Sequence, residues 1–355
     1  MAIQFEQVSF AYDEISLWRH NALLEVDLYL ADGVFAGIAG ASGSGKSTLM
    51  QHLNGILKPT GGKVHVLDVT MEAGGKAPPL RELRRRVGLV FQFPEQQLFE
   101  DTVEKDLCFG PLNFGCSLDE AKARARRALA LVGLDDTFLS RNPLRLSGGQ
   151  MRKVAIASVL AMEPDVIALD EPTATLDPQS RVELAEMLAR LHREQGKTVI
   201  VVTHRMEEIL PYAEQWIVMK DGRKSFQGSA AELVREAPRL ESEGLAIPAC
   251  IRYWNQAAAL FGLTGEPPCL TAEALAERLA RLLSDESGAD RSEEQPELVG
   301  RSEERGASAG ALVEGHVLEE LPVPASLSVD QPVPAGRLKP ILSGVSGEGG
   351  NGHAK

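Results

Sequence analysis

Residues 40–47, which decide the fold of this chain, are Gly40-Ala41-Ser42-Gly43-Ser44-Gly45-Lys46-Ser47. An apolar run, Val34 to Ala39, precedes them and a helix-like segment, Thr48 to Leu57, follows. A G-x-x-x-x-G-K-[ST] match between a strand and a helix indicates a phosphate-binding loop. Glycines let backbone N–H groups close around phosphate oxygens, and the helix directs its positive end at the same anion. Lys46 would reach the β- and γ-phosphates and the Ser47 hydroxyl would hold Mg²⁺. The alternative is a glycine-rich turn with a chance lysine.

The composition limits the class of protein. With 355 residues the chain has room for one large domain or two ordinary ones. Its formal net charge of −13 argues against a nucleic-acid-binding surface, which usually carries a basic patch. No apolar run reaches about 18 residues and the N-terminus begins with a strand pattern rather than a signal peptide, so any membrane role is expected to be peripheral. The cysteines lie far apart with no C-x-x-C pair, which favours reduced thiols in a cytosolic protein over a metal site. They are Cys108, Cys116, Cys250 and Cys269.

Hydrophobic patterning predicts an α/β fold. Residues 3–10 alternate loosely and residues 24–30 cleanly, which favours an antiparallel sheet at the edge of the domain. From Val34 onward short apolar runs alternate with helical segments, as is typical of a parallel α/β core. The predicted core strands are 34–39, 87–91, 165–170 and 198–203, and we expect 63–68 and 215–227 at sheet edges.

Three capping patterns predict where later helices begin. Two are capping boxes, in which a serine and a glutamate three residues later satisfy each other's backbone N–H groups. The third is an aspartate followed by proline at the first helical position. They are Ser117-Leu118-Asp119-Glu120, which opens a helix to about Val132, Ser229-Ala230-Ala231-Glu232, and Asp177-Pro178.

A second motif, Leu146-Ser147-Gly148-Gly149-Gln150, opens an apparent helix over 150–162. With average residue usage a given pentapeptide occurs at about one in a million positions. It is another helix start with two glycines and a hydroxyl, which suits an anion. L-S-G-G-Q is the signature of ATP-binding-cassette ATPases, and the chain therefore resembles that family. The alternative is a solvent-facing Ser-Gly-Gly turn.

This resemblance implies a fold and a dimer. The fold is α/β, a P-loop NTPase with a RecA-like parallel sheet core, an N-terminal antiparallel β subdomain, a helical signature subdomain and a small C-terminal helical appendix. In this family the signature of one subunit closes over the γ-phosphate held by the loop of its partner, in a head-to-tail dimer with two buried ATP molecules. The implied ATP contacts in this sequence are Gly40, Ala41, Ser42, Gly43, Ser44, Gly45, Lys46, Ser47 and Thr48 in the loop, Ser147, Gly148, Gly149 and Gln150 in the signature, and Asp177.

A third motif is an apolar run that ends in two carboxylates, Val166-Ile167-Ala168-Leu169-Asp170-Glu171. A buried parallel strand presents such groups at its carboxyl end, where open α/β sheets bind ligands. Asp170 fits the Walker-B role, bound to Mg²⁺ directly or through water, and Glu171 fits a base that polarises the attacking water. A lone Asp-Glu pair would usually belong to a solvated loop, so this interpretation depends on the other two motifs.

Further site residues follow from the resemblance. Gln92, after the strand 87–91, matches the Q-loop glutamine, which senses Mg²⁺ and the γ-phosphate. His204, at the end of the strand 198–203, matches the switch histidine, which hydrogen-bonds the γ-phosphate. Tyr12 matches the aromatic residue that stacks on adenine, although Trp18 could supply the ring instead. The family usually has glycine where Thr175 stands, which leaves the coupling between the two sites open.

The chain divides into three expected regions. Residues 1–228 form the nucleotide-binding domain, with its helical subdomain at about 100–162, and residues 229–284 form a C-terminal helical region. Residues 285–355 hold 13 acidic and 6 basic side chains, with many Gly, Pro and Ser and almost no aromatics. Such a stretch cannot bury enough apolar surface to offset the entropy of ordering, so we expect a disordered tail.

Within the cassette ATPases, residues 1–284 are most similar to the ATPase subunits of energy-coupling-factor (ECF) importers. The similarity lies in the run from Phe91 to Phe99, in Thr102 to Asp106 and in Phe109-Gly110-Pro111. Residues 51–55 and the insertion 13–21 resemble the second of the two paralogous ATPases. The resemblance implies a heterodimer with a sister ATPase, although a homodimer is possible. It also implies a transmembrane coupling protein and a membrane substrate-binding subunit, at the cytoplasmic face of the cell membrane. The substrates would be vitamins or transition metals such as cobalt or nickel.

The apolar residues from Phe93 to Phe99 could form a groove for a partner's helix, or they could only pack the helical subdomain onto the core.

Other functions fit the motifs less well. A soluble cassette ATPase acting on DNA would separate loop and signature by hundreds of coiled-coil residues, whereas here the gap is about 100. One acting on ribosomes would carry two cassettes. A binding-only cassette is disfavoured by intact catalytic motifs, and a metabolic P-loop kinase does not need the signature.

Overall fold

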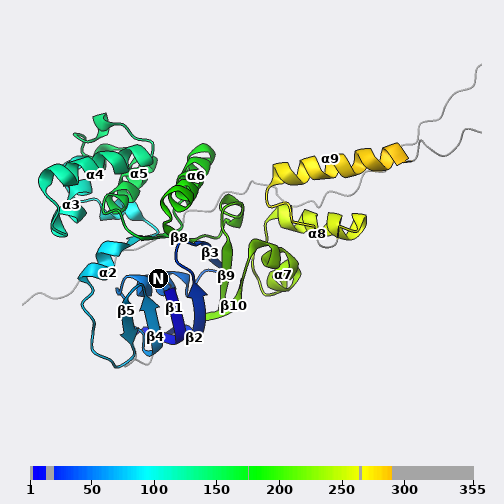
Figure 1. Ribbon diagram of the computed structural model, residues 1–355, viewed down its shortest axis with the longest axis horizontal. Helices are drawn as coiled ribbons and strands as arrows, with labels where there is room; N and C mark the ends of the chain where they lie inside the picture. Colours follow the sequence, from blue (N-terminus) through cyan, green and yellow to red (C-terminus); the bar gives the residue numbers. More distant parts are fainter. Residues whose placement is uncertain (1–2, 13–19, 175, 264–265, 290–355) are drawn as a thin grey trace, which may run out of the picture. The chain divides into compact units, whose positions relative to one another are not determined.

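The computed structural model describes residues 3–12, 20–174, 176–263 and 266–289 (Figure 1). Four N-terminal strands form an antiparallel sheet in the order β2-β1-β4-β5. Their bounds are β1 (Ile3–Tyr12), β2 (His20–Leu30), β4 (Gly61–Val66) and β5 (Val69–Glu72). The predicted antiparallel sheet is therefore present. The expectation that residues 63–68 lie at its edge is wrong, because the short strand β5 pairs with β4 and takes the edge position.

The second sheet has the strand order β10-β9-β3-β8-β7-β6. The strands from β9 to β6 are parallel to their neighbours, and only the edge strand β10 is antiparallel. Their bounds are β3 (Phe35–Gly40), β6 (Val87–Val90), β7 (Val166–Asp170), β8 (Thr198–Val202), β9 (Gln215–Lys220) and β10 (Arg223–Gly228). All four predicted core strands are present, and of the stretch 215–227 only β10 is an edge.

The six-stranded sheet separates two hydrophobic cores, because successive side chains of a strand point to opposite faces. Phe35 of β3 and Val199 of β8 pack into the core on the side of helices α3–α6. Ile38 and Ile200 of the same strands pack into the other core, with α1 and the antiparallel sheet. Continuous apolar runs are therefore needed in these strands, as the sequence shows.

Nine α-helices lie in the described residues, and the three starts predicted from capping patterns have a side-chain cap. Ser117 accepts a hydrogen bond from the Glu120 N–H, Asp177 accepts one from Ser180, and Ser229 and Glu232 form the complete capping box. The helices are α1 (Lys46–Leu53), α2 (Arg81–Arg86), α3 (Val103–Asn113), α4 (Leu118–Leu131), α5 (Gly148–Leu160), α6 (Pro178–Gln195), α7 (Ala230–Ser242), α8 (Ala249–Phe261) and α9 (Ala272–Ala289). Short 3₁₀ turns span Pro94–Gln97, Asp136–Phe138, Pro143–Arg145 and Met206–Glu208.

Helix boundaries differ from the expected ones at three places. The helix after the glycine loop ends at Leu53 rather than Leu57, and Gly55 just beyond its end has a left-handed φ of 68°. The signature helix begins at Gly148 rather than at residue 150. Helix α9 continues to Ala289, past the expected start of the tail at 285. Thr175, the Trp18 segment and residues 290–355 lie outside the described residues.

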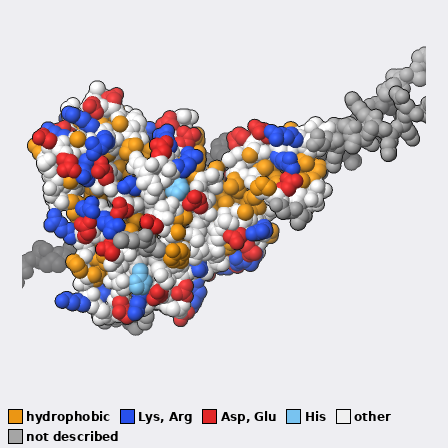
Figure 2. Space-filling view, viewed as in Figure 1, with side chains coloured by type: hydrophobic (Ala, Val, Ile, Leu, Met, Phe, Trp, Pro, Cys, Tyr) orange, Lys and Arg blue, Asp and Glu red, His pale blue; other side chains and the backbone are white. Residues whose placement is uncertain are grey.

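Helices α3, α4 and α5 pack on one another, and α7, α8 and α9 follow in series (Figure 1). No described helix is both long and apolar enough to cross a bilayer. The four cysteines are free thiols. On the face shown in Figure 2, acidic and basic side chains are intermingled, without a large patch of one sign.

Candidate nucleotide site

The carboxyl ends of four neighbouring strands bring the predicted polar residues together. Strand β3 leads into the glycine loop, β6 is followed by Gln92, β7 ends at Asp170 before Glu171, and β8 precedes His204. Since these strands are adjacent in the order β3-β8-β7-β6, their ends share one edge of the sheet. A cavity of about 330 Å³ opens there, lined by Tyr12, Ala22, Gly40, Ser42, Gly43, Gly45, Lys46, Ser47, Thr48, Gln92, Asp170, Glu171 and His204.

The backbone of the loop requires glycine. Gly40 and Gly45 have φ angles of 145° and 100°, which residues with side chains rarely adopt. A Cβ on Gly40 would lie 2.2 Å from the Met219 carbonyl oxygen, and one on Gly45 would lie 2.4 Å from that of Ala22. Helix α1 starts directly after Gly45, which offers no side-chain cap. The first-turn N–H groups of α1 are therefore left for an anion.

Lys46 lies over this loop. Its Nζ donates to the carbonyl oxygens of Gly40 at 2.9 Å and of Ala41 at 2.7 Å. Burial lowers the pKa of Lys46, and the nearby carboxylates of Glu171 and Asp170 oppose that shift. Carbonyl oxygens held by an ammonium group can be exchanged for phosphate oxygens, so Lys46 is placed to bind the phosphates of a nucleotide.

Ser47 and Asp170 form the oxygen cluster of the site. The Ser47 hydroxyl donates a hydrogen bond to the Asp170 carboxylate. Burial raises the pKa of Asp170, and this hydrogen bond opposes the shift. A hydroxyl, a carboxylate and the Gln92 amide on one cavity wall are oxygen donors of the kind that Mg²⁺ prefers.

Glu171 and His204 are paired, with 2.7 Å between Glu171 Oε2 and His204 Nδ1. Glu171 is mostly buried and has a φ of 49°, in the left-handed region, where a non-glycine residue is strained by about 1–2 kcal/mol. Its N–H donates to the Val202 carbonyl at 2.9 Å, which holds it in that conformation between β7 and β8. Strain of this kind is typical of functional positions.

Tyr12 stands at the rim of the cavity, at the end of β1. Its hydroxyl lies 3.2 Å from Thr48 Oγ1, and its ring packs edge-on against Phe10 with 4.8 Å between the centroids. The ring remains partly exposed, so one face can receive a base.

The signature residues and Asp177 do not line this cavity. Ser147 Oγ accepts from the Gln150 N–H at 3.3 Å, and Gln150 Oε1 accepts from the Ser147 N–H at 3.2 Å. Asp177 accepts from the Ser180 N–H at 3.0 Å, and hydrogen bonds to Ser180 lower the pKa of Asp177. Within the chain, Ser147, Gln150 and Asp177 cap the starts of their own helices.

The sequence analysis missed Arg152, which is fully buried in the second turn of α5. Its guanidinium donates to the backbone carbonyl of Gln92 at 2.6 Å and to that of Pro172 at 3.4 Å. The arginine therefore joins the signature helix to the residues beside Gln92 and Glu171. The available signal was a cation at the start of an apolar helical run, with no acidic residue three or four positions away to pair with it.

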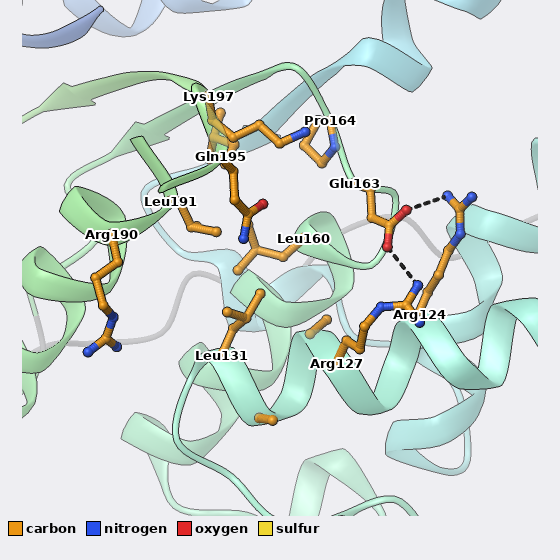
Figure 3. Close-up of a pocket in the computed structure, with 13 residues that line it drawn as sticks. Arg124, Arg127, Leu131, Leu160, Glu163, Pro164, Arg190, Leu191, Gln195 and Lys197 are labelled. Carbon is orange, nitrogen blue, oxygen red and sulfur yellow. Dashed lines mark hydrogen bonds and ion pairs between the residues drawn. The ribbon is translucent and has the colours of Figure 1, made fainter. Parts of the chain in front are cut away.

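A larger cavity of about 430 Å³ lies at the amino ends of β7 and β8 and contains none of the predicted site residues. Figure 3 shows Glu163 there between the guanidinium groups of Arg124 and Arg127, at 3.5 Å and 2.7 Å. Helices α4, α5 and α6 all end at this cavity, and cations stabilise the partial negative charge of helix C-termini. The basic side chains that line this cavity are therefore explained by the helix ends and by Glu163, and they do not indicate a function.

The comparisons agree with the geometry. The profile of the family described as "ABC transporter" matches residues 23–174. Among solved structures, the dimeric post-hydrolysis state of the ATP-binding cassette MJ0796 bound to ADP and Pi is 31% identical, with a TM-score of 0.59 over 64% of this chain and 98% of that chain. CbiO1 from Clostridium perfringens, part of the ABC transporter complex cbiONQ, is 33% identical, with a TM-score of 0.59 over 71% and 98%.

Curated relatives bear the name energy-coupling factor transporter ATP-binding protein EcfA2. The one from Bacillus cereus is 49% identical over 283 residues, 80% of this chain and 97% of the relative. Those from Geobacillus kaustophilus and Listeria innocua are 48% identical over 284 residues, 80% of this chain and 98% and 99% of the relatives. At this identity over nearly the whole of each relative, the chain belongs to the ATP-binding-cassette ATPases and, within them, to the ATP-binding proteins of energy-coupling factor transporters.

Proposed function

We propose that this importer ATPase hydrolyses Mg²⁺-ATP in a head-to-tail dimer with a sister ATPase, each signature completing the site of the other chain. Solute uptake is coupled to that cycle through a transmembrane coupling protein and a membrane substrate-binding subunit. The solute is a vitamin or a transition metal. The chain works at the cytoplasmic face of the cell membrane, held there by these partners.

One observation carries the head-to-tail arrangement. Among the described residues, a Cβ on Gly148 would meet no atom within 4 Å outside its own helix backbone, and one on Gly149 would meet only Leu176 Cδ2, at 3.8 Å. Neither residue has a positive φ. The fold of the chain therefore does not require glycine at either place, although glycine weakens a helix relative to alanine. Close approach of a second body, the phosphates of a nucleotide held by the partner, accounts for both glycines.

The residues of the cavity then have separate tasks. Loop N–H groups and Lys46 bind the phosphates, and Tyr12 stacks on the base. Ser47, Asp170 and Gln92 would hold Mg²⁺, which neutralises phosphate charge when bound. Glu171 orients the attacking water and accepts its proton, a role worth about 10²–10⁴ in rate. His204 donates to the Glu171 carboxylate through Nδ1, and in its doubly protonated form a second donor, Nε2–H, is left for the γ-phosphate.

The docking surface for the coupling protein is formed by the exposed aromatic residues Phe93, Phe99 and Phe109. The side chains of Phe93 and Phe99 are 48% and 62% exposed, and the Phe99 and Phe109 rings pack edge-on at 4.9 Å. Exposed aromatic residues that lie together are typical of a binding surface. Phe93 directly follows Gln92, so a partner bound there would lie next to a residue that lines the nucleotide cavity. A soluble role on DNA or ribosomes is not favoured, since the curated relatives are transporter proteins.

The test of the dimer is ATP-driven association. In a Glu171→Gln background, which retains ATP, the chain and its sister ATPase should form a stable complex in Mg²⁺-ATP, measured by light scattering after size exclusion. Adding Gly149→Arg should abolish this complex because the side chain occupies the place of the phosphates. ATP binding by the separate chain, which uses the loop 40–47, is the internal control and should not change. Association that survives Gly149→Arg would contradict the head-to-tail arrangement.

A further inference from the structure

Arg152 is an unusual residue to bury. It is 0% exposed, and removing a guanidinium group from water is costly unless its N–H donors are satisfied. Two of those donors reach the carbonyls of Gln92 and Pro172. The Nε donor is buried and makes no hydrogen bond in the described part of the chain. The fork of donors is therefore only partly used.

The missing acceptor is close by. Glu95 Oε2 lies 3.5 Å from Arg152 Nε and is itself buried without a donor among the described residues. The two groups form an ion pair that does not reach the geometry of a hydrogen bond, since neither atom has a hydrogen-bond partner among the described residues. A movement of less than about 1 Å would convert it into a charge-assisted hydrogen bond. Both unsatisfied groups therefore lie at one contact, which a small movement would convert into a hydrogen bond.

Glu95 occupies a special place in the sequence. It lies in the turn Pro94–Gln97, between the exposed rings of Phe93 and Phe99. A partner seated on those rings would press on the turn that carries Glu95. Arg152, on the other side of the ion pair, holds the backbone of Gln92 and of Pro172, next to Glu171. It also belongs to α5, whose first turn is the signature.

We propose that Arg152 is a positioning residue that couples the docking segment 93–99 to the signature helix and the catalytic loops. Binding of the coupling protein closes the contact between Arg152 and Glu95. The closed contact fixes Gln92, the loop after Glu171 and the start of α5 relative to one another, and ATP hydrolysis becomes faster in the assembled importer. This inference rests on the proposed function and adds the route by which docking reaches the nucleotide.

The experiment measures one ratio, the ATPase rate of the reconstituted importer divided by that of the ATPase pair without membrane partners. Glu95→Gln keeps the shape and loses the charge, and Arg152→Lys keeps the charge and loses the fork. Each should lower the ratio about fivefold, since a charged hydrogen bond is replaced by a weaker contact. The double variant should lower it no further, because both changes remove the same contact. Glu243→Gln is the matched control. The Glu243 side chain is 26% exposed, as against 25% for Glu95, and it also pairs with an arginine, Arg239, in a part of the sequence distant from the segment 93–99.

The outcomes separate the two proposals. A wild-type importer whose ATPase does not respond to its membrane partners would contradict the proposed function itself. A wild-type response that all three variants retain would overturn the role of Arg152. A lowered melting temperature with an unchanged ratio would also overturn it, because a purely structural arginine gives that result. Effects that add in the double variant would show that Arg152 and Glu95 act through separate contacts.

Discussion

The two glycine-containing helix starts of this chain, at α1 and α5, are built in opposite ways. At α1 the glycines are required by the fold, and no side chain caps the helix. At α5 a side chain on either glycine would make at most an ordinary contact with the part of the chain that the structure describes, and Ser147 and Gln150 cap the helix with a complete capping box. The first helix start therefore presents all its first-turn donors, whereas at the second the N–H groups of Ser147 and Gln150 are already in use.

In the proposed dimer, this difference bears on the order in which the two helix starts meet a nucleotide. The start of α1 is preorganised and can bind phosphates in the separate chain. At α5 the Ser147 hydroxyl accepts from the Gln150 N–H and keeps its own proton to donate to a phosphate. Since Ser147 does not line the cavity of its own chain, that contact requires a nucleotide held by a partner. We therefore expect binding at α1 to precede closure over α5, and the following variants test that difference.

The largest effect is expected for Glu171→Gln, which leaves both helix starts intact and removes the base. ATP turnover should fall by about 10²–10⁴, with ATP affinity unchanged, because the amide cannot accept a proton from water. Steady-state phosphate release and equilibrium ATP binding measure the two quantities. Glu194→Gln, an exposed position on α6, is the control. Turnover near the wild-type rate would assign the base to another residue.

The second effect concerns the far end of α1, where His52 is buried without solvent exposure. Its Nδ1 donates to the Thr48 carbonyl at 2.7 Å, and burial lowers the pKa of His52 to about 4. The unfolded chain then binds more protons than the folded one, so stability is complete above pH ~6.5 and falls as the pH drops toward 4. The loss is about 2 kcal/mol by pH 5 and about 3 kcal/mol by pH 4.

Urea unfolding at pH 7.5 and pH 5 checks this prediction, with His52→Gln as the matched variant. The glutamine cannot titrate, so the part of the acid destabilisation due to His52 should vanish. Helix α5 has no histidine and should not contribute. An equal loss of stability in the variant would show that other groups cause the acid sensitivity.

Much of the nucleotide cavity was predictable from the sequence because parallel strands deliver their carboxyl ends to one edge. Lys46, Gln92, Asp170, Glu171 and His204 each follow a recognisable apolar run, and all five line one cavity. The shared edge is a property of the topology, so no distance between these residues had to be known in advance.

The features that sequence reasoning missed depend on contacts between distant segments. Arg152 reaches carbonyls at positions 92 and 172, and no local pattern encodes that reach. The inner position of β4 depends on β5, a four-residue strand too short to give a periodic signal. The early start of α5 reflects the reciprocal bonds of Ser147 and Gln150, which set the cap before the glycines rather than after them.

A third prediction concerns Gly45, at the start of α1. Gly45→Ala should destabilise the chain by about 2 kcal/mol or more, because a side chain at φ 100° is strained and its Cβ would lie 2.4 Å from the Ala22 carbonyl. The loop must then shift away from β2, and ATP affinity should fall with stability. Thermal unfolding and ATP titration measure the two effects. Full stability in this variant would mean that the glycine is not required by the fold, which would remove the contrast with α5.

The smallest effect on stability, and the most informative, is expected for Gly149→Ala. Its Cβ enters ordinary contact with Leu176, and alanine favours the helix, so the free energy of unfolding should rise by about 0.5 kcal/mol. ATP binding by the separate chain should not change, whereas hydrolysis by the ATPase pair should fall because the methyl group stands where the phosphate must approach. Gly148→Ala, whose Cβ would have no described residue outside its helix within 4 Å, should behave in the same way. A variant that gains stability and loses only the activity of the dimer would show that these glycines serve the partner's nucleotide. A loss of stability would instead assign them to the fold of this chain.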